Sequence, residues 1–412
     1  MKSLYDYYAD EKYSLNLNYY EIPQFILGLD CFNDYGRTFI ENYFFYGLKG
    51  QLVDNIDQLD GMRSIHSNIV FILGGIIFFK ILGKSNDNFI TYANEYYPFS
   101  YVWYLTSLAH DFGYIMENDG ELLDFAQGLE CKEQQAIINN ILINHYGSFI
   151  NRIISRAVPM KCCKKCENNQ LLMLHSDFDD KKRYSEFLGT LDRRYHQKKI
   201  LNVDGIKISN ASRYNYRTCV NYFVYGLKEN NFLNHGILGA RAYNKKIIQI
   251  YRCACCEKIR QSSQELVDFN HFLLRERVFS NGVLHVNKYI SSVINDHNIW
   301  KSSKNTEKIY HKYLLDELIS DRFNKISYTN NPLLYILCIA DTIEPIKVFN
   351  NNHELIIHEF FIEVKEKQLC ITVSDSLKQS NEWVNYKKRL FDLNDWIDIN
   401  VFIENDIITV EL

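Results

Sequence analysis

The stretch SLAHDFGYIME, residues 107–117, decides the fold because it sets a histidine and an aspartate next to each other inside an apolar segment. Apolar residues on both sides of His110 and Asp111 recur at the spacing of a buried helix. A buried carboxylate beside a buried imidazole needs a partner, and a metal ion is one such partner. Alone, the dipeptide says little, because His-Asp pairs are common at surface turns and helix caps.

Four further residues of metal-ligand type lie in apolar surroundings, and with the pair they give the order His, His-Asp, His, His, Asp: His66, His235, His297 and Asp341. His66 stands at the head of the apolar segment 61–79, and Asp341 ends the apolar run LLYILCIA, where it is either a helix cap or a ligand. Each alone is more readily explained as a structural residue. Together, imidazole nitrogens and carboxylates suit one or two divalent transition metal ions, namely Mn, Fe, Ni or Zn.

These residues carry a resemblance to the HD superfamily of metal-dependent phosphohydrolases, whose motifs follow the same order. RSIHS, NHGILGA, the stretch ending in DHN, and CIADTIEPIK are similar to the branch that hydrolyses diadenosine tetraphosphate symmetrically. The resemblance covers the core from about Gly61 to Lys347, except for a stretch from Cys162 to about Val220 and a segment around 253–256. It implies a bundle of α-helices around the metals.

The resemblance also implies roles for the ligands. It assigns His66, His110, Asp111 and Asp341 to one ion, and Asp111, His235 and His297 to the other, with Asp111 bridging the two. Two such ions lower the pKa of a bound water and stabilise charge on phosphoryl oxygens. The expected reaction is in-line attack on a phosphoester or phosphoanhydride.

One position departs from the pattern of the superfamily. Many relatives carry a lysine three residues beyond the His-Asp pair, where it faces the phosphate, and this chain has Tyr114 there. Transition-state charge must then be met by the metals alone or by another cation. The candidates are Arg63, one turn before His66, Arg241 and Lys347.

Two cysteine clusters predict a second, structural metal site. The C-x-x-C pairs place four thiolates around one zinc ion: Cys163, Cys166, Cys253 and Cys256. Cys162 and Cys255 could replace their neighbours, so the ligand set stays open between them. The alternative is a group of buried thiols, and disulfides are disfavoured because no signal peptide is recognised.

Composition is typical of a folded enzyme of the cytoplasm. With 412 residues, of which 47% are hydrophobic and 23% charged, the chain can build one large domain and a small one. A net charge of -4 gives no basic footprint for nucleic acid, so nucleic acid is the less favoured partner. The most apolar run, 69–79, is too short to span a bilayer, and we expect no membrane contact. The sequence does not indicate an oligomeric state.

The chain is expected to be mainly α-helical and to have three parts. Residues 1–60 form a helical cap, residues 61–347 form the HD core with a charged, zinc-stapled insertion at about 162–220, and residues 348–412 form a small α+β domain of order ββαββ. In the last part, 353–375 predicts two strands, 381–393 a helix, and 399–412 a hairpin turning at residues 404–406.

Three functions remain open on the sequence. The first is hydrolysis of a small nucleotide, such as a dinucleoside polyphosphate, a nucleoside triphosphate or a cyclic nucleotide. The second is a metal-dependent nuclease for single-stranded nucleic acid, which the cysteine pairs and the basic residues of 177–199 would serve. The third is a catalytically silent ligand-binding module, against which the intact ligand set argues.

Overall fold

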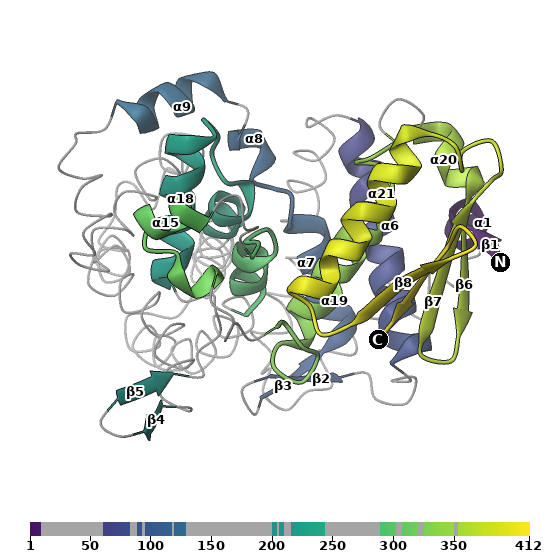
Figure 1. The fold of residues 1–412 in the computed structure, drawn as a ribbon, viewed down its shortest axis with the longest axis horizontal. Helices are drawn as coiled ribbons and strands as arrows, with labels where there is room; N and C mark the ends of the chain where they lie inside the picture. Colours follow the sequence, from purple (N-terminus) through teal and green to yellow (C-terminus); the bar gives the residue numbers. More distant parts are fainter. Residues whose placement is uncertain are drawn as a thin grey trace, which may run out of the picture. The chain divides into compact units, whose positions relative to one another are not determined.

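The computed structural model describes residues 1–9, 61–82, 89–92, 95–117, 119–128, 200–203, 206–209, 216–243, 289–301, 307–319, 325–349 and 353–412 (Figure 1). This described part is mainly helical, as the sequence predicts, and ends in an antiparallel sheet. It divides into two compact units. The first holds the described residues up to Leu108 and those from Lys325 onward, and the second holds those between them.

Three apolar helices form the centre of the first unit. They are α6 (Gly61–Ile76), which continues as a π-helical turn at Ile77–Ile81, α7 (Phe99–Ala109) and α19 (Pro332–Ile343). Gly74 of α6 lets α7 approach closely, because a Cβ there would lie 1.9 Å from the Trp103 ring. The Trp103 indole also donates a hydrogen bond of 2.9 Å to the Phe71 oxygen. Within the described residues, no helix is both long and apolar enough to cross a membrane.

Helix α19 is buried along its whole length, as expected for a helix that is apolar on all sides. Its start is well defined, because the Asn331 side chain accepts the Leu334 N–H at 3.3 Å and Pro332 occupies the first helical position. The helix packs against α6. Asp341 therefore lies in the last turn of a rigid, buried element.

The carboxyl-terminal part has the predicted ββαββ order and contributes to a five-stranded antiparallel sheet of order β1-β6-β7-β9-β8. Its elements are β6 (Phe360–Lys365), β7 (Gln368–Val373), α21 (Asn381–Phe391), the 3-10 turn Asp392–Asp395, β8 (Asn400–Glu404) and β9 (Ile407–Glu411). The β8–β9 turn falls at Asn405 and Asp406, whose φ angles of 49° and 59° are those of a tight hairpin turn.

Two expectations for this sheet were wrong. Residues His353–Glu359 form helix α20 and not the start of a strand. The expectation failed because the periodicity of a short apolar run does not distinguish a strand from a helix. The fifth strand, β1 (Lys2–Ser3), comes from the predicted helical cap, and Lys2 pairs with Ile362. Helix α1 (Leu4–Ala9) follows it, while the rest of the expected cap lies outside the described residues.

The described residues of the second unit form mainly short helices. They are α8 (Tyr114–Glu117), α9 (Gly120–Gln127), α15 (Tyr216–Glu229), the helical residues 235–243 and 289–296, α18 (Glu307–Lys312) and the 3-10 turn Asp316–Leu318. Asn234 caps the helix at 235–243, since its side chain accepts the Ile237 N–H at 2.9 Å. This cap sets His235 at the first turn of its helix.

Two glycines allow close backbone packing in this unit. A Cβ on Gly113 would lie 1.8 Å from the His235 oxygen, and a Cβ on Gly239 would lie 2.8 Å from the Gly113 nitrogen. The backbone of the turn after His110 and Asp111 therefore packs directly against the backbone of the helix at 235–243.

Two small hairpins complete the described structure. One pairs β2 (Phe89–Tyr92) with β3 (Glu95–Pro98) and the other pairs β4 (Ile200–Val203) with β5 (Ile206–Ser209). The second lies within the predicted insertion, whose other features fall outside the described residues.

Candidate metal centre

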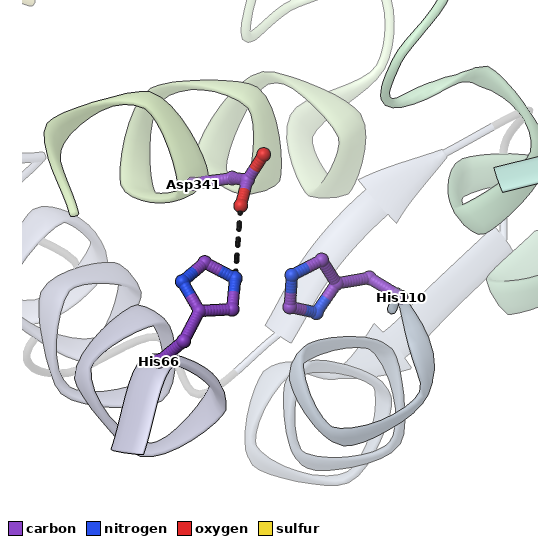
Figure 2. A group of neighbouring side chains, drawn as sticks. All are labelled: His66, His110 and Asp341. Atoms are coloured by element: carbon purple, nitrogen blue, oxygen red, sulfur yellow. Dashed lines mark ion pairs between the residues drawn. The ribbon is translucent and has the colours of Figure 1, made fainter. Parts of the chain in front are cut away.

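The first group of possible ligands comprises His66, His110 and Asp341. They come from α6, from the residue directly after α7, and from the last turn of α19, and their ligand atoms all lie within 4.8 Å of one another. Figure 2 shows the two imidazoles and the carboxylate pointing toward one another, with His66 Nε2 3.2 Å from Asp341 Oδ1. All three residues are buried. This arrangement could hold a metal ion.

A second group comprises Asp111, His235 and His297, whose ligand atoms also lie within 4.8 Å of one another. His235 Nε2 is 3.7 Å from Asp111 Oδ1, and the His235 and His297 rings are 5.3 Å apart. None of the three is more than 8% exposed. Because His110 and Asp111 are consecutive, one turn supplies a residue to each group, and their side chains are 3.4 Å apart.

Three of the four imidazoles are oriented through Nδ1. His66 Nδ1 lies 2.7 Å from Glu344 Oε2, His297 Nδ1 lies 2.6 Å from the Ile294 oxygen, and His235 Nδ1 lies 3.2 Å from Glu117 Oε2. A carboxylate or carbonyl oxygen only accepts, so Nδ1 carries the proton. This is the orientation of metal-binding histidines, in which Nε2 is left to face the ion.

The contact between His66 and Asp341 would suit a cation. With Nδ1 donating to Glu344, the Nε2 lone pair faces Asp341 Oδ1 at 3.2 Å, and two acceptors cannot bond to each other. A metal ion between the two atoms, or a proton on either of them, would resolve the contact. The donor set of imidazole nitrogen and carboxylate oxygen fits a divalent transition metal.

Sequence reasoning did not single out Glu344 or Glu117 as site residues. Glu344 is fully buried beyond the end of α19, and it also accepts the Ile346 N–H at 2.6 Å and the Lys347 N–H at 3.4 Å. Its signal in the sequence was a glutamate directly before Pro345, three residues after Asp341. Glu117 was visible only as a glutamate three residues beyond Tyr114.

The predicted cations fall in different surroundings. Lys347 Nζ lies 2.7 Å from Asp341 Oδ1, and its side chain is 24% exposed. Arg241 is buried in the helix that begins at His235. Arg63 belongs to α6, and its side chain lies outside the described part. Tyr114 stacks on the His235 ring, with the ring centroids 3.8 Å apart.

Helix α21 contacts the end of α19 that carries Asp341. Arg389 donates from Nη2 to the Asp341 main-chain oxygen at 3.0 Å, and the Tyr386 hydroxyl donates to the Ile343 oxygen. The last carbonyls of a helix have no partner within it, so these donors satisfy them. Burial raises the pKa of the Tyr386 hydroxyl well above its ordinary value, which keeps it a donor.

The predicted zinc ligands Cys163, Cys166, Cys253 and Cys256 all lie outside the described residues, so this site stays a prediction. Cys338 and Cys370 are buried, in α19 and β7.

The comparisons with known proteins find no match for this chain. No family model matches the chain, and no curated protein or solved structure matches it.

Proposed function

We propose that this chain is a metal-dependent phosphohydrolase of the HD type that hydrolyses a small nucleotide. One observation carries the proposal. Six residues that follow the order His, His-Asp, His, His, Asp along the chain lie in two buried His/Asp groups, although 275 positions separate the first, His66, from the last, Asp341. The Nδ1 contacts of three of the histidines add to it, because they leave Nε2 for an ion.

Each residue then has a defined task. His66, His110 and Asp341 would hold one ion, and Asp111, His235 and His297 the other, with Asp111 shared as the resemblance implies. The ions, when bound, would supply an activated water and stabilise the charge of the phosphoryl group. Glu344 holds the His66 ring, and burial of the six side chains limits competition from bulk water for the ions.

We assign recognition of the phosphate to Lys347. Of the two candidate cations whose side chains the structure describes, Lys347 contacts a proposed ligand and is partly exposed, whereas Arg241 is buried. A phosphoryl oxygen that replaces Asp341 as the partner of the ammonium group would gain a charge-assisted hydrogen bond.

The substrate class follows from charge. A net charge of -4 does not favour a polyanionic strand, and a small nucleotide needs only local cations. A nuclease is the alternative, supported by the basic residues of 177–199, and a silent binding module is the third.

The experiment uses the full chain with Mn²⁺, a panel of dinucleoside polyphosphates, nucleoside triphosphates and cyclic nucleotides, and labelled single-stranded DNA. Asp111→Ala should abolish product release while the helical circular dichroism is kept. Asp124→Ala, a matched change at an exposed aspartate of α9, should leave it intact. Cleavage of DNA alone would replace the proposal by the nuclease, and full activity of Asp111→Ala would overturn the site.

A further inference from the structure

We propose that helix α8 positions the imidazole of His235. In this proposal, Tyr114 fixes the plane of the ring and Glu117 fixes its tautomer, so that Nε2 faces Asp111. The inference rests on the proposed metal site and gives a role to the residue that stands in place of the usual lysine. Both are positioning residues that act through His235.

The contact of Tyr114 is face to face. The Tyr114 and His235 rings stack with centroids 3.8 Å apart and an angle of 17° between their planes. A stacked aromatic ring restricts rotation of the imidazole out of its plane. Tyr114 therefore packs on a proposed ligand and does not take the place of a phosphate-binding cation.

Glu117 contacts the Nδ1 atom of the same imidazole. Tyr114 and Glu117 are three residues apart on one short helix, so their side chains lie on the same side of it. Glu117 Oε2 lies 3.2 Å from His235 Nδ1, and Oε1 lies 3.3 Å from it. A carboxylate oxygen that accepts a hydrogen bond from Nδ1–H leaves the lone pair on Nε2, which lies 3.7 Å from Asp111 Oδ1.

Asn298 also contacts the ring, with its Nδ2 3.2 Å from His235 Nε2 and 3.4 Å from Nδ1. The amide group therefore borders both ring nitrogens, and the preference for a proton on Nδ1 comes from Glu117.

The backbone holds α8 in place beside the ring. Gly113 directly precedes α8, and a Cβ on it would lie 1.8 Å from the His235 oxygen. Main chain therefore contacts main chain at the start of the helix. The stack and the hydrogen bond extend from a fixed point, which is what a positioning element requires.

The test measures Mn²⁺ binding by the full chain, with free Mn²⁺ counted by electron paramagnetic resonance. Mn²⁺ prefers nitrogen and oxygen ligands and binds thiolates poorly, so the cysteine pairs should not contribute to the measured binding. We expect two bound ions in the unmodified protein. Glu117→Ala should weaken the binding of one ion by about 10–100-fold and leave the binding of the other unchanged. In other proteins, loss of a hydrogen bond to a metal-binding histidine lowers metal affinity by this amount. Tyr114→Leu should weaken the same ion, and Tyr114→Phe should not.

The matched control is Ile115→Ala, an exposed position between the two residues on the same helix, which should leave both ions unchanged. A second measurement needs no metal: nitrogen NMR of the ion-free protein labelled in histidine, with the His235 signal assigned by His235→Gln. The Nδ1-protonated tautomer is expected in the unmodified protein, and Glu117→Ala should shift the population toward protonation at Nε2.

The outcomes separate the inference from the proposed function. If the unmodified protein binds no Mn²⁺, the metal site fails, and the tautomer measurement still decides whether Glu117 controls the ring. If it binds Mn²⁺ and the variants keep both the affinity and the tautomer, the positioning role is overturned and the metal site stands. Equal weakening of both ions would mean general loss of structure and would also overturn it.

Discussion

The Arg389 guanidinium lies 3.0 Å from the main-chain oxygen of Asp341 and donates a hydrogen bond to it. Asp341 is thus held by its backbone as well as by its side chain, which contacts His66 and Lys347. The donor belongs to α21, the helix of the ββαββ part. This part therefore contributes a contact that holds one residue of the candidate site.

Arg389→Ala should lower both stability and metal affinity. Loss of a hydrogen bond from a charged donor costs roughly 1.5 kcal/mol, and affinity for the ion held by Asp341 should fall by about tenfold. Chemical denaturation and Mn²⁺ titration measure the two effects. Lys388→Ala, at the exposed neighbouring position of α21, is the control, and an equal loss there would refute a specific role of Arg389.

Glu344→Ala should destabilise the protein around His66, His110 and Asp341. The carboxylate accepts from the His66 ring and from two backbone N–H groups, and it is fully buried. Its removal leaves buried donors without an acceptor, at a cost of roughly 1–3 kcal/mol each, so the melting temperature should fall clearly. Glu344→Gln, which keeps one acceptor oxygen, should lose less, and Glu404→Gln at an exposed strand end should lose nothing measurable. Equal melting temperatures for all three variants would contradict the arrangement.

Alanine substitutions at two glycines should act in opposite directions. At Gly113 a Cβ would lie 1.8 Å from a backbone oxygen, which cannot move as a side chain can, so Gly113→Ala should unfold the site or displace His235. At Gly120 a Cβ would meet no atom within 4 Å, and Gly120→Ala in α9 should stabilise the protein by about 0.5–1 kcal/mol. Thermal unfolding checks both signs, and a tolerated Gly113→Ala would count against the close approach.

Lys347→Met should separate phosphate recognition from metal binding. The change removes the cation 2.7 Å from Asp341 Oδ1, so kcat/KM should drop by roughly 10–100-fold, the value of one charged hydrogen bond. Mn²⁺ affinity should be unchanged or higher, because the carboxylate loses a competing partner. Lys325→Met, at an exposed position, serves as the control. A fall in Mn²⁺ affinity would show that Lys347 supports the ligand and does not act on the substrate.

The contact between α15 and α18 should make the stability of the fold depend on pH in the acid range. Hydrogen bonds from Lys312 and then Tyr313 lower the pKa of Glu229 below its ordinary 4.5. A lowered folded-state pKa gives stability that is present above pH 4.5 and is lost as the pH falls through the lower value. Glu229→Gln should therefore lower the melting temperature at neutral pH and flatten its decline in acid. Glu121→Gln, an exposed glutamate of α9, should leave both unchanged.

The parts of this structure that the sequence could predict have local signals. His66, His110 and Asp341 each stand beside apolar residues of helical spacing, and the turn at Asn405 and Asp406 uses residues that tolerate positive φ. A polar residue within an apolar pattern can be recognised from the sequence alone, even when its partner in the structure is far away along the chain. For this reason the six ligands could be proposed together.

The parts that escaped prediction depend on distant pairs. Glu344 contacts a histidine 278 positions away, and Glu117 contacts one 118 positions away, so neither glutamate has a local feature that sets it apart. Strand β1 has two residues, too few for any alternation to appear. Residues 353–359 carry an apolar run that fits a strand as well as a helix, and in the structure they form helix α20.

The division of the chain into two units has a consequence for its synthesis. The first unit is discontinuous, since strand β1 and helices α6 and α7 precede the whole of 109–324, while α19, α21 and strands β6 to β9 follow it. A ribosome therefore completes the residues around Asp111, His235 and His297 while His66 still awaits Asp341. Pairing across such a separation is slow. Residues up to 324 include all of Asp111, His235 and His297, whereas the group of His66, His110 and Asp341 can form only after the carboxyl-terminal segment has been made.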